Sequence, residues 1–194
     1  MSRPQLTRDP LGRVILTSLD TPSTGPRPAY LDTCVISALA KGELSPADSA
    51  GFVAISRAVD RSDLTLCAST VAKREIDQIP QAFRQTHLTE YNALRILRGS
   101  ASTNWIDDRA ASPTFGQPRI HPTFDGFTKV VSDRADAEHL FQAKVNGVTD
   151  FITTDRRTIL NKAPQLRAAF GINAYSPAEY HALVLKSATS NDAA

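Results

Sequence analysis

From residue 29 onward, short apolar runs alternate with segments whose apolar residues recur at helical spacing. The apolar runs predict strands at 30–31, 64–67 and 151–153. The other segments predict helices over 35–40, 46–59, 71–79, 81–98, 133 or 136 to 145, and 156–170 with a break near Pro164. This alternation is typical of an α/β protein with a central parallel sheet flanked by helices on both faces.

The same pattern divides the chain along its length. Residues 1–28 are rich in proline, and we expect them to form an N-terminal extension in which only 14–19 has the pattern of a strand. Residues 29–183 form the main domain, with a loop insertion at about 99–126 that has no periodic pattern and is either functional or poorly ordered. Residues 184–194 are a tail that we expect to be disordered.

Composition narrows the class of protein but names no partner. The chain has 22 basic and 20 acidic side chains, and 41% of its residues are hydrophobic, as in ordinary globular proteins. No apolar run approaches the ~18 residues of a membrane-spanning helix, and no secretory signal is evident, so we expect a soluble, cytoplasmic protein. Cys34 and Cys67 lie in apolar surroundings, which favours free thiols over a disulfide.

Two aspartates follow predicted strands directly. Asp32 comes after 30–31 and is the only charged residue from Pro28 to Ala40, and the strand at 151–153 runs into Thr154 and Asp155. The carboxyl ends of parallel strands meet at one edge of a sheet, where ligands bind. Asp32 also precedes a helical stretch, so an N-cap role is an equally good explanation for it.

Three further residues lie on faces where their chemistry is unexpected. Glu75 shares the apolar face of its predicted helix, although a flanking charge that reaches water would explain it. Asp136 lies at the start of the helix predicted to end at 145, where an acid also complements the helix dipole. His139 lies one turn after Asp136 on roughly the same face, where a structural role is the more common explanation.

Together these acids predict a metal site. Asp32, Glu75, Asp136 and Asp155 would repel one another if they met without a positive charge. A hard divalent cation with oxygen ligands, Mg²⁺ or Mn²⁺, resolves that conflict. Such a site suits hydrolysis of phosphodiester bonds.

The order and wording of the segments that carry these acids resemble one protein family. Residues 29–36, 69–76, 136–143 and 150–160, followed by 171–179, are similar to the PIN-domain nucleases. This is the fold of many toxins in type II toxin–antitoxin pairs (VapC-like proteins). The likeness covers about residues 29–180, and the ordered set is more specific than any single segment.

The resemblance implies a PIN-like fold and a metal-dependent endoribonuclease. Asp32, Glu75, Asp136 and Asp155 would bind Mg²⁺ or Mn²⁺ and activate water for RNA cleavage. The supporting residues would be Thr33, Thr154 and His139. The two threonines would belong to the metal shell or hold a carboxylate or phosphate, and His139 matches a histidine common in one PIN subgroup.

Partners follow from the charge distribution and from the same resemblance. We expect Arg156, Arg157, Lys162 and Arg74 to contact the RNA backbone, although a solvated helical face is the default explanation for each of them. The resemblance also implies a possible antitoxin protein and a possible homodimer. Two alternatives remain open: a structure-specific DNA nuclease of the same fold, and a PIN scaffold that binds without catalysis.

Overall fold

The computed structural model describes residues 5–8, 14–17, 26–96, 104–106, 118–120 and 122–185. The predicted α/β architecture is confirmed, because one parallel sheet has the strand order β5-β4-β3-β8-β9. Its strands are β3 (Arg27–Leu31), β4 (Leu64–Ala68), β5 (Arg95–Ile96), β8 (Asp150–Ile152) and β9 (Asn173–Tyr175). Two short antiparallel pairs lie outside it: β1 (Gln5–Arg8) with β2 (Val14–Thr17), and β6 (Asn104–Ile106) with β7 (Pro118–Ile120).

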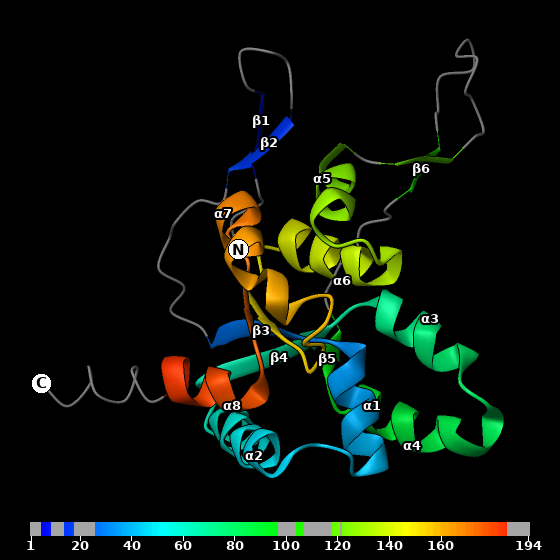
Figure 1. Ribbon diagram of the computed structural model, residues 1–194, viewed down its shortest axis with the longest axis vertical. Coiled ribbons are helices and arrows are strands. Elements are labelled where there is room, and N and C mark those ends of the chain that lie inside the picture. The colour runs from blue at the N-terminus through cyan, green and yellow to red at the C-terminus, as the bar shows by residue number, and fades with distance from the viewer. Residues whose placement is uncertain are drawn as a thin grey trace, which may run out of the picture.

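Helices cover both faces of the sheet, as expected (Figure 1). On one face the core is completed by α1 (Thr33–Lys41), α2 (Pro46–Asp60), α3 (Thr70–Gln78), α4 (Gln81–Asn92), α8 (Pro177–Tyr180) and the π-helical turn η2 (His181–Leu185). On the other lie α5 (Pro122–Val130), α6 (Arg134–Val145) and α7 (Ala163–Phe170), which follows a 3-10 turn, η1 (Leu160–Lys162).

The side chains of β3 alternate between these two cores. Ala29 and Leu31 are buried with the first group of helices, and Tyr30 is buried with the second. β8 continues the alternation, with Ile152 in the first core and Phe151 in the second. Both faces of the central strands are therefore apolar, which is the reason that these strands appear as continuous apolar runs in the sequence.

Serine side chains cap the starts of two of the predicted helices. The Ser45 side chain accepts from the Asp48 N–H at the start of α2, and the Ser69 side chain accepts from the Val71 N–H at the start of α3. The two cysteines are free thiols, as expected. No helix in the described ranges has both the length and the apolar character needed to cross a membrane.

The helix predicted over 81–98 is too long. It ends at Asn92, and the two residues of β5 then pair with β4, with Cys67 opposite Arg95 and Ala68 opposite Ile96. Leu94 and Leu97 continue the helical spacing of the sequence, so the periodicity did not reveal this end. A tertiary strand pairing decided it, and residues 97 and 98 lie outside the described part of the chain.

Three other predicted boundaries are wrong. The loop expected to reach residue 126 gives way to α5 at Pro122, because Phe124 and Phe127 recur at helical spacing and bury themselves in the second core. The helix expected from residue 156 begins only at Ala163 as α7, after a turn and η1, so the expected break near Pro164 is the place where the α-helix starts. A proline there lacks only a donor that the first turn leaves free. Val184, expected in the tail, is buried in the first core.

Parts of the terminal and loop expectations fall on residues without a description. In the N-terminal extension, β2 matches the first part of the strand expected at 14–19, and β1 is an additional strand that the sequence did not predict. Residues 18–25, most of the loop at 99–117, and the tail from residue 186 lie outside the described ranges. The sheet begins at Arg27, two residues before the expected domain start.

A close contact between α2 and α8 gives the first testable prediction. A methyl group added at Gly51 would lie 2.4 Å from the Pro177 carbonyl oxygen. Alanine usually stabilises a helix more than glycine does. We nevertheless expect Gly51→Ala to lower the free energy of unfolding by about 1–3 kcal/mol, because the backbone at Pro177 would have to move to make room for the methyl group. Urea denaturation measures this change.

The matched control is Gly126→Ala in α5. An added methyl there meets only a ring carbon of the Phe170 side chain at 3.3 Å, which can shift at smaller cost. If Gly51→Ala is as stable as the wild type, or loses no more stability than Gly126→Ala, α2 does not pack on α8 as closely as described.

Candidate active site

Asp32 follows β3 and is the N-cap residue of α1. Its backbone N–H donates to the Ile152 carbonyl of β8 at 3.0 Å, which ties the ends of the two strands together. The carboxylate is 3% exposed and accepts from the Thr33 N–H at 2.8 Å, the Thr153 hydroxyl at 2.7 Å and the Cys34 thiol at 3.0 Å. These donors hold the carboxylate in one orientation, so Asp32 caps the helix and also faces the carboxyl edge of the sheet.

Asp136 and Asp155 meet through a single hydroxyl. Thr158 Oγ1 lies 2.6 Å from Asp136 Oδ2 and also contacts Asp155 Oδ2. A hydroxyl carries one hydrogen, so it can donate to only one of two ionised carboxylates. Burial, together with the charges of Asp32, Asp133 and Asp155, raises the pKa of Asp136 to about 6 against the opposing hydrogen bond from Thr158. Asp136 therefore lies close enough to Asp32 and Asp155 to be repelled by both carboxylates.

Glu75 reaches the same region from α3, paired with His139 of α6. His139 Nε2 lies 2.9 Å from Glu75 Oε2 and 3.9 Å from Asp32 Oδ1. Burial by itself would raise the pKa of Glu75 and lower that of His139. Their mutual hydrogen bond and opposite charges reverse both shifts, so the pKa of Glu75 is lowered and that of His139 is raised.

The two threonines named from the sequence contact different partners. Thr33 hydrogen-bonds the Glu75 carboxylate, and its Oγ1 lies 3.2 Å from His139 Nε2. Thr154 donates to Cys34 Sγ through both its backbone N–H and its hydroxyl, each at 3.2 Å. Burial, followed by the charge of Asp32, raises the pKa of the Cys34 thiol well above its ordinary value, so Cys34 stays protonated and can donate to Asp32.

The basic residues expected to contact RNA lie in two places. Arg156 and Arg157 are exposed in the turn after Asp155, and Lys162 is exposed at the end of η1. Arg74 lies apart from them on α3, where it forms an ion pair with Glu138 of α6 and keeps a side chain that is 58% exposed. It is therefore a link between two helices as well as a cation near the site.

Asp150 shows how the protein treats a buried acid that belongs to the framework. It is completely buried, and the Arg27 guanidinium pairs with it at 2.7 Å. By contrast, across the described ranges no lysine or arginine forms an ion pair with Asp32, Asp136 or Asp155. The acids at the carboxyl edge lack the compensation that the framework acid has.

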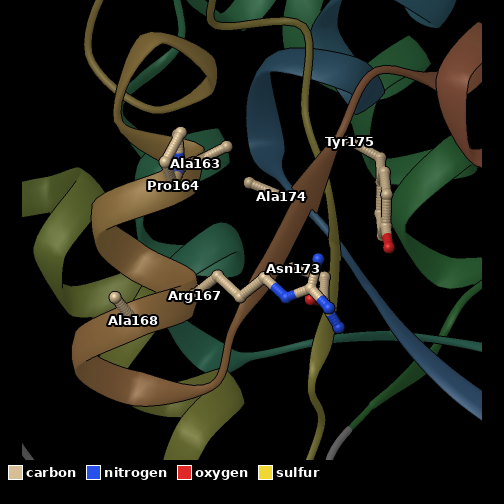
Figure 2. Close-up of a pocket in the computed structure, with 7 residues that line it drawn as sticks. All are labelled: Ala163, Pro164, Arg167, Ala168, Asn173, Ala174 and Tyr175. Carbon is tan, nitrogen blue, oxygen red and sulfur yellow. The ribbon is translucent and has the colours of Figure 1, made fainter.

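A groove of about 660 Å³ lies between α7 and β9, the last strand in the sheet order (Figure 2). It is lined by Ala163, Pro164, Arg167, Ala168, Asn173, Ala174 and Tyr175. Most of these side chains are small or apolar, and none of the candidate acids is among them. The groove is therefore separate from the acidic cluster.

The donor atoms of the cluster fit a hard divalent cation in kind. Carboxylates that repel one another, one with a raised pKa and two sharing one hydroxyl hydrogen, are the ligands that Mg²⁺ and Mn²⁺ favour. The arrangement of these side chains, however, does not match a metal site. Within the described part of the chain, no group of three or more His, Cys, Asp or Glu side chains is arranged so that it could hold a metal ion.

Several residues of this region were not found from the sequence: Tyr30, Cys34, Ser69, Thr153 and Thr158. Thr158 follows Asp155 by one helical turn, a spacing that could have indicated the contact. Tyr30 carries no such signal, since an aromatic residue in an apolar strand looks like any core residue. Its hydroxyl partners come from residues 69 and 139, which only the fold brings near it.

Comparisons of this chain with protein-family models, curated proteins and solved structures found no match. The resemblance to the PIN-domain nucleases therefore rests on the residues of this chain. The charges of Asp32 and Asp155 act on Asp136, and those of Glu75, Asp32 and Asp136 act on His139.

The raised pKa of Asp136 gives a pH-dependent prediction. An acid whose pKa is higher in the folded state destabilises the fold once it ionises, so the penalty grows as the pH rises from about 4 through about 6. We expect Asp136→Asn to raise the free energy of unfolding in metal-free buffer at pH 7.5. The gain should be about 1 kcal/mol, because solvent screens this half-buried side chain.

Urea denaturation at pH 4 and pH 7.5 measures the effect, and the gain should vanish at the lower pH. Asp133→Asn is the matched control, because it removes an acid from the same helix start and keeps an N-cap acceptor. It should gain less stability than Asp136→Asn, because the charge of Asp133 is only one of the causes that raise the pKa of Asp136. A gain for Asp136→Asn that is the same at both pH values would mean that its ionisation is not penalised by the fold.

Proposed function

We propose that this chain is a PIN-like, Mg²⁺- or Mn²⁺-dependent endoribonuclease. One observation carries the proposal: carboxylates from separate elements converge at the carboxyl edge of the parallel sheet without a lysine or arginine among the described residues to pair with Asp32, Asp136 or Asp155. Keeping such a cluster costs stability. That cost is expected where a cation has to bind.

In this proposal the metal is held by Asp32, Asp136 and Asp155, and Glu75 completes the set directly or through water. The cation would lower the pKa of a water molecule and stabilise the charge that develops on the phosphate. The protein's own part is orientation. Asp32 is fixed by its donors, and the Arg157 and Thr158 N–H groups hold one oxygen of Asp155. The Thr158 hydroxyl links the other oxygen of Asp155 to Asp136.

The substrate side of the proposal rests on cations near the acids. Arg156 and Arg157 follow Asp155 directly and are exposed, so they can hold the RNA backbone while Asp155 faces the reacting phosphate. Lys162 extends this basic stretch, and Arg74 contributes from α3. Attack of water on the phosphorus would leave a 5′-phosphate and a 3′-hydroxyl.

Replacement of single acids tests the proposal. We expect Asp32→Asn and Asp136→Asn each to reduce RNA cleavage at least about 100-fold in Mg²⁺ or Mn²⁺ buffer, because each removes a charge that has no substitute in the cluster. Sequencing of RNA ends after brief expression, wild type beside Asp32→Asn, would show new 5′-phosphate ends only for the wild type.

Asp133→Asn is the control from the same helix and should cleave at nearly the wild-type rate. Calorimetry with Mn²⁺ should detect binding to the wild type and weaker binding to Asp136→Asn. Full cleavage by the acid variants, with contaminants excluded, contradicts the assignment. Cleavage of branched DNA in preference to RNA would favour the structure-specific DNA nuclease, and absence of metal binding would favour a non-catalytic binding scaffold.

The toxin role and its partners form a further part of the proposal. A toxin of this type would have a cognate antitoxin that blocks the acidic edge, and it could act as a homodimer. We expect that loss of a small neighbouring gene makes the gene for this chain lethal, and that Asp32→Asn removes the lethality. Growth assays of the paired deletions measure this, and growth that is unaffected by loss of every neighbouring gene contradicts the toxin role.

A further inference from the structure

A buried hydrogen-bonded chain connects the start of α3 with its middle. The Tyr30 hydroxyl lies 2.6 Å from Ser69 Oγ, the N-cap of α3, and 2.7 Å from His139 Nδ1. His139 Nε2 lies 2.9 Å from Oε2 of Glu75, on the same helix as the cap. This series of hydrogen bonds therefore runs from the N-cap of α3 through β3 and α6 and back to α3.

The surroundings of His139 determine where its hydrogen lies. Nε2 faces the carboxylates of Glu75 at 2.9 Å and Asp32 at 3.9 Å, so a lone pair there would be repelled and Nε2 must carry the hydrogen. Nδ1 faces the Tyr30 hydroxyl, which can donate to it or accept from it. In either case His139 presents an N–H to Glu75.

The members of the chain have little freedom to move. Tyr30 and Ser69 are completely buried and His139 is 1% exposed. The Tyr30 ring stacks on Phe151, with ring centroids 5.0 Å apart and planes 6° apart, and it meets the His139 ring edge-on at 5.8 Å. Only Glu75, at the open end of the chain, is partly exposed, at 28% of its side chain.

We propose that Tyr30 and His139 are positioning residues that fix the Glu75 carboxylate at the acidic edge, with one oxygen held by His139. This inference rests on the proposed hydrolase function for its consequence, because Glu75 would complete the acidic set. His139 holds Oε2 of Glu75, and the Thr33 side chain also hydrogen-bonds this carboxylate. Partners of this kind are typically worth about 10–100-fold in metal affinity or activity.

A double-mutant cycle tests the consequence. We expect His139→Leu to lower kcat for RNA by about 10–100-fold with little change in KM, and Glu75→Gln to lower it by a similar factor. The double variant should be no slower than the slower single variant, because both changes remove one device. His139→Gln, whose amide can donate from the position of Nε2, should recover a large part of the loss.

Tyr30→Phe removes only a hydroxyl, so it tests the proposal even if the histidine variants misfold. We expect it to lower kcat several-fold. The matched control is His87→Leu in α4, which makes the same substitution at a histidine that is 2% exposed. Among the described residues, His87 hydrogen-bonds only the Phe83 carbonyl, through Nδ1. This variant should keep the wild-type kcat. Multiplicative losses in the cycle, or equal losses for His87→Leu and His139→Leu, overturn the proposal.

A measurement without metal or RNA separates this inference from the proposed function. In ¹⁵N-labelled, metal-free protein, the Nε2 hydrogen of His139 should be visible and protected from exchange with water, and Glu75→Gln should speed its exchange by at least about 10-fold. An unprotonated Nε2, or exchange that Glu75→Gln leaves unchanged, overturns the positioning role. If the wild type cleaves no RNA, the proposed function fails, and the exchange rate still decides whether His139 holds Glu75.

Discussion

The parallel pairing of β3 with β8 decides where Asp32 and the loop that carries Asp155 lie. Leu31 is in register with Ile152, and the next N–H, that of Asp32, donates to the Ile152 carbonyl. Thr153 then follows one strand and Asp32 the other, so the hydroxyl and the carboxylate meet at 2.7 Å. Because Asp155 N–H in turn donates to Thr153 Oγ1 at 3.0 Å, the loop that carries the second aspartate is attached to the same point.

The acidic edge exists at the expense of stability. The framework resolves the burial of Asp150 with a guanidinium, at the opposite end of the same strand pair. At the carboxyl edge it supplies hydroxyls, a thiol and backbone N–H groups, which orient carboxylates without a positive charge, and one histidine, which pairs with Glu75. Under the proposed function, donors of this kind would orient the carboxylates and leave their charge for a cation.

The two cores of the molecule share this edge. Tyr30 belongs to the core beneath α5, α6 and α7, yet its hydroxyl reaches across the sheet edge to the N-cap of α3. Tyr91 of α4 adds a hydrogen bond from its hydroxyl to the Ser69 carbonyl. α3 is therefore fastened to the rest of the fold by buried polar contacts as well as by the apolar side chains of Ala72 and Ile76. Buried polar contacts of this kind specify one arrangement, since any other would leave hydrogen-bonding groups unsatisfied.

The sequence alone predicted the fold class, the main strands and several helices, and it singled out four acids as candidates, because hydrophobic period and the position of a charge after an apolar run are local properties. It could not determine that 95–96 leave the helical pattern for a strand, since that depends on the free edge of β4. Nor could it distinguish Tyr30 from any other buried aromatic residue, or show that Thr158 lies between two acids. Those roles are contacts between residues distant in the chain or on different elements, and only the tertiary structure, by bringing strand ends and helix faces to one edge, creates them.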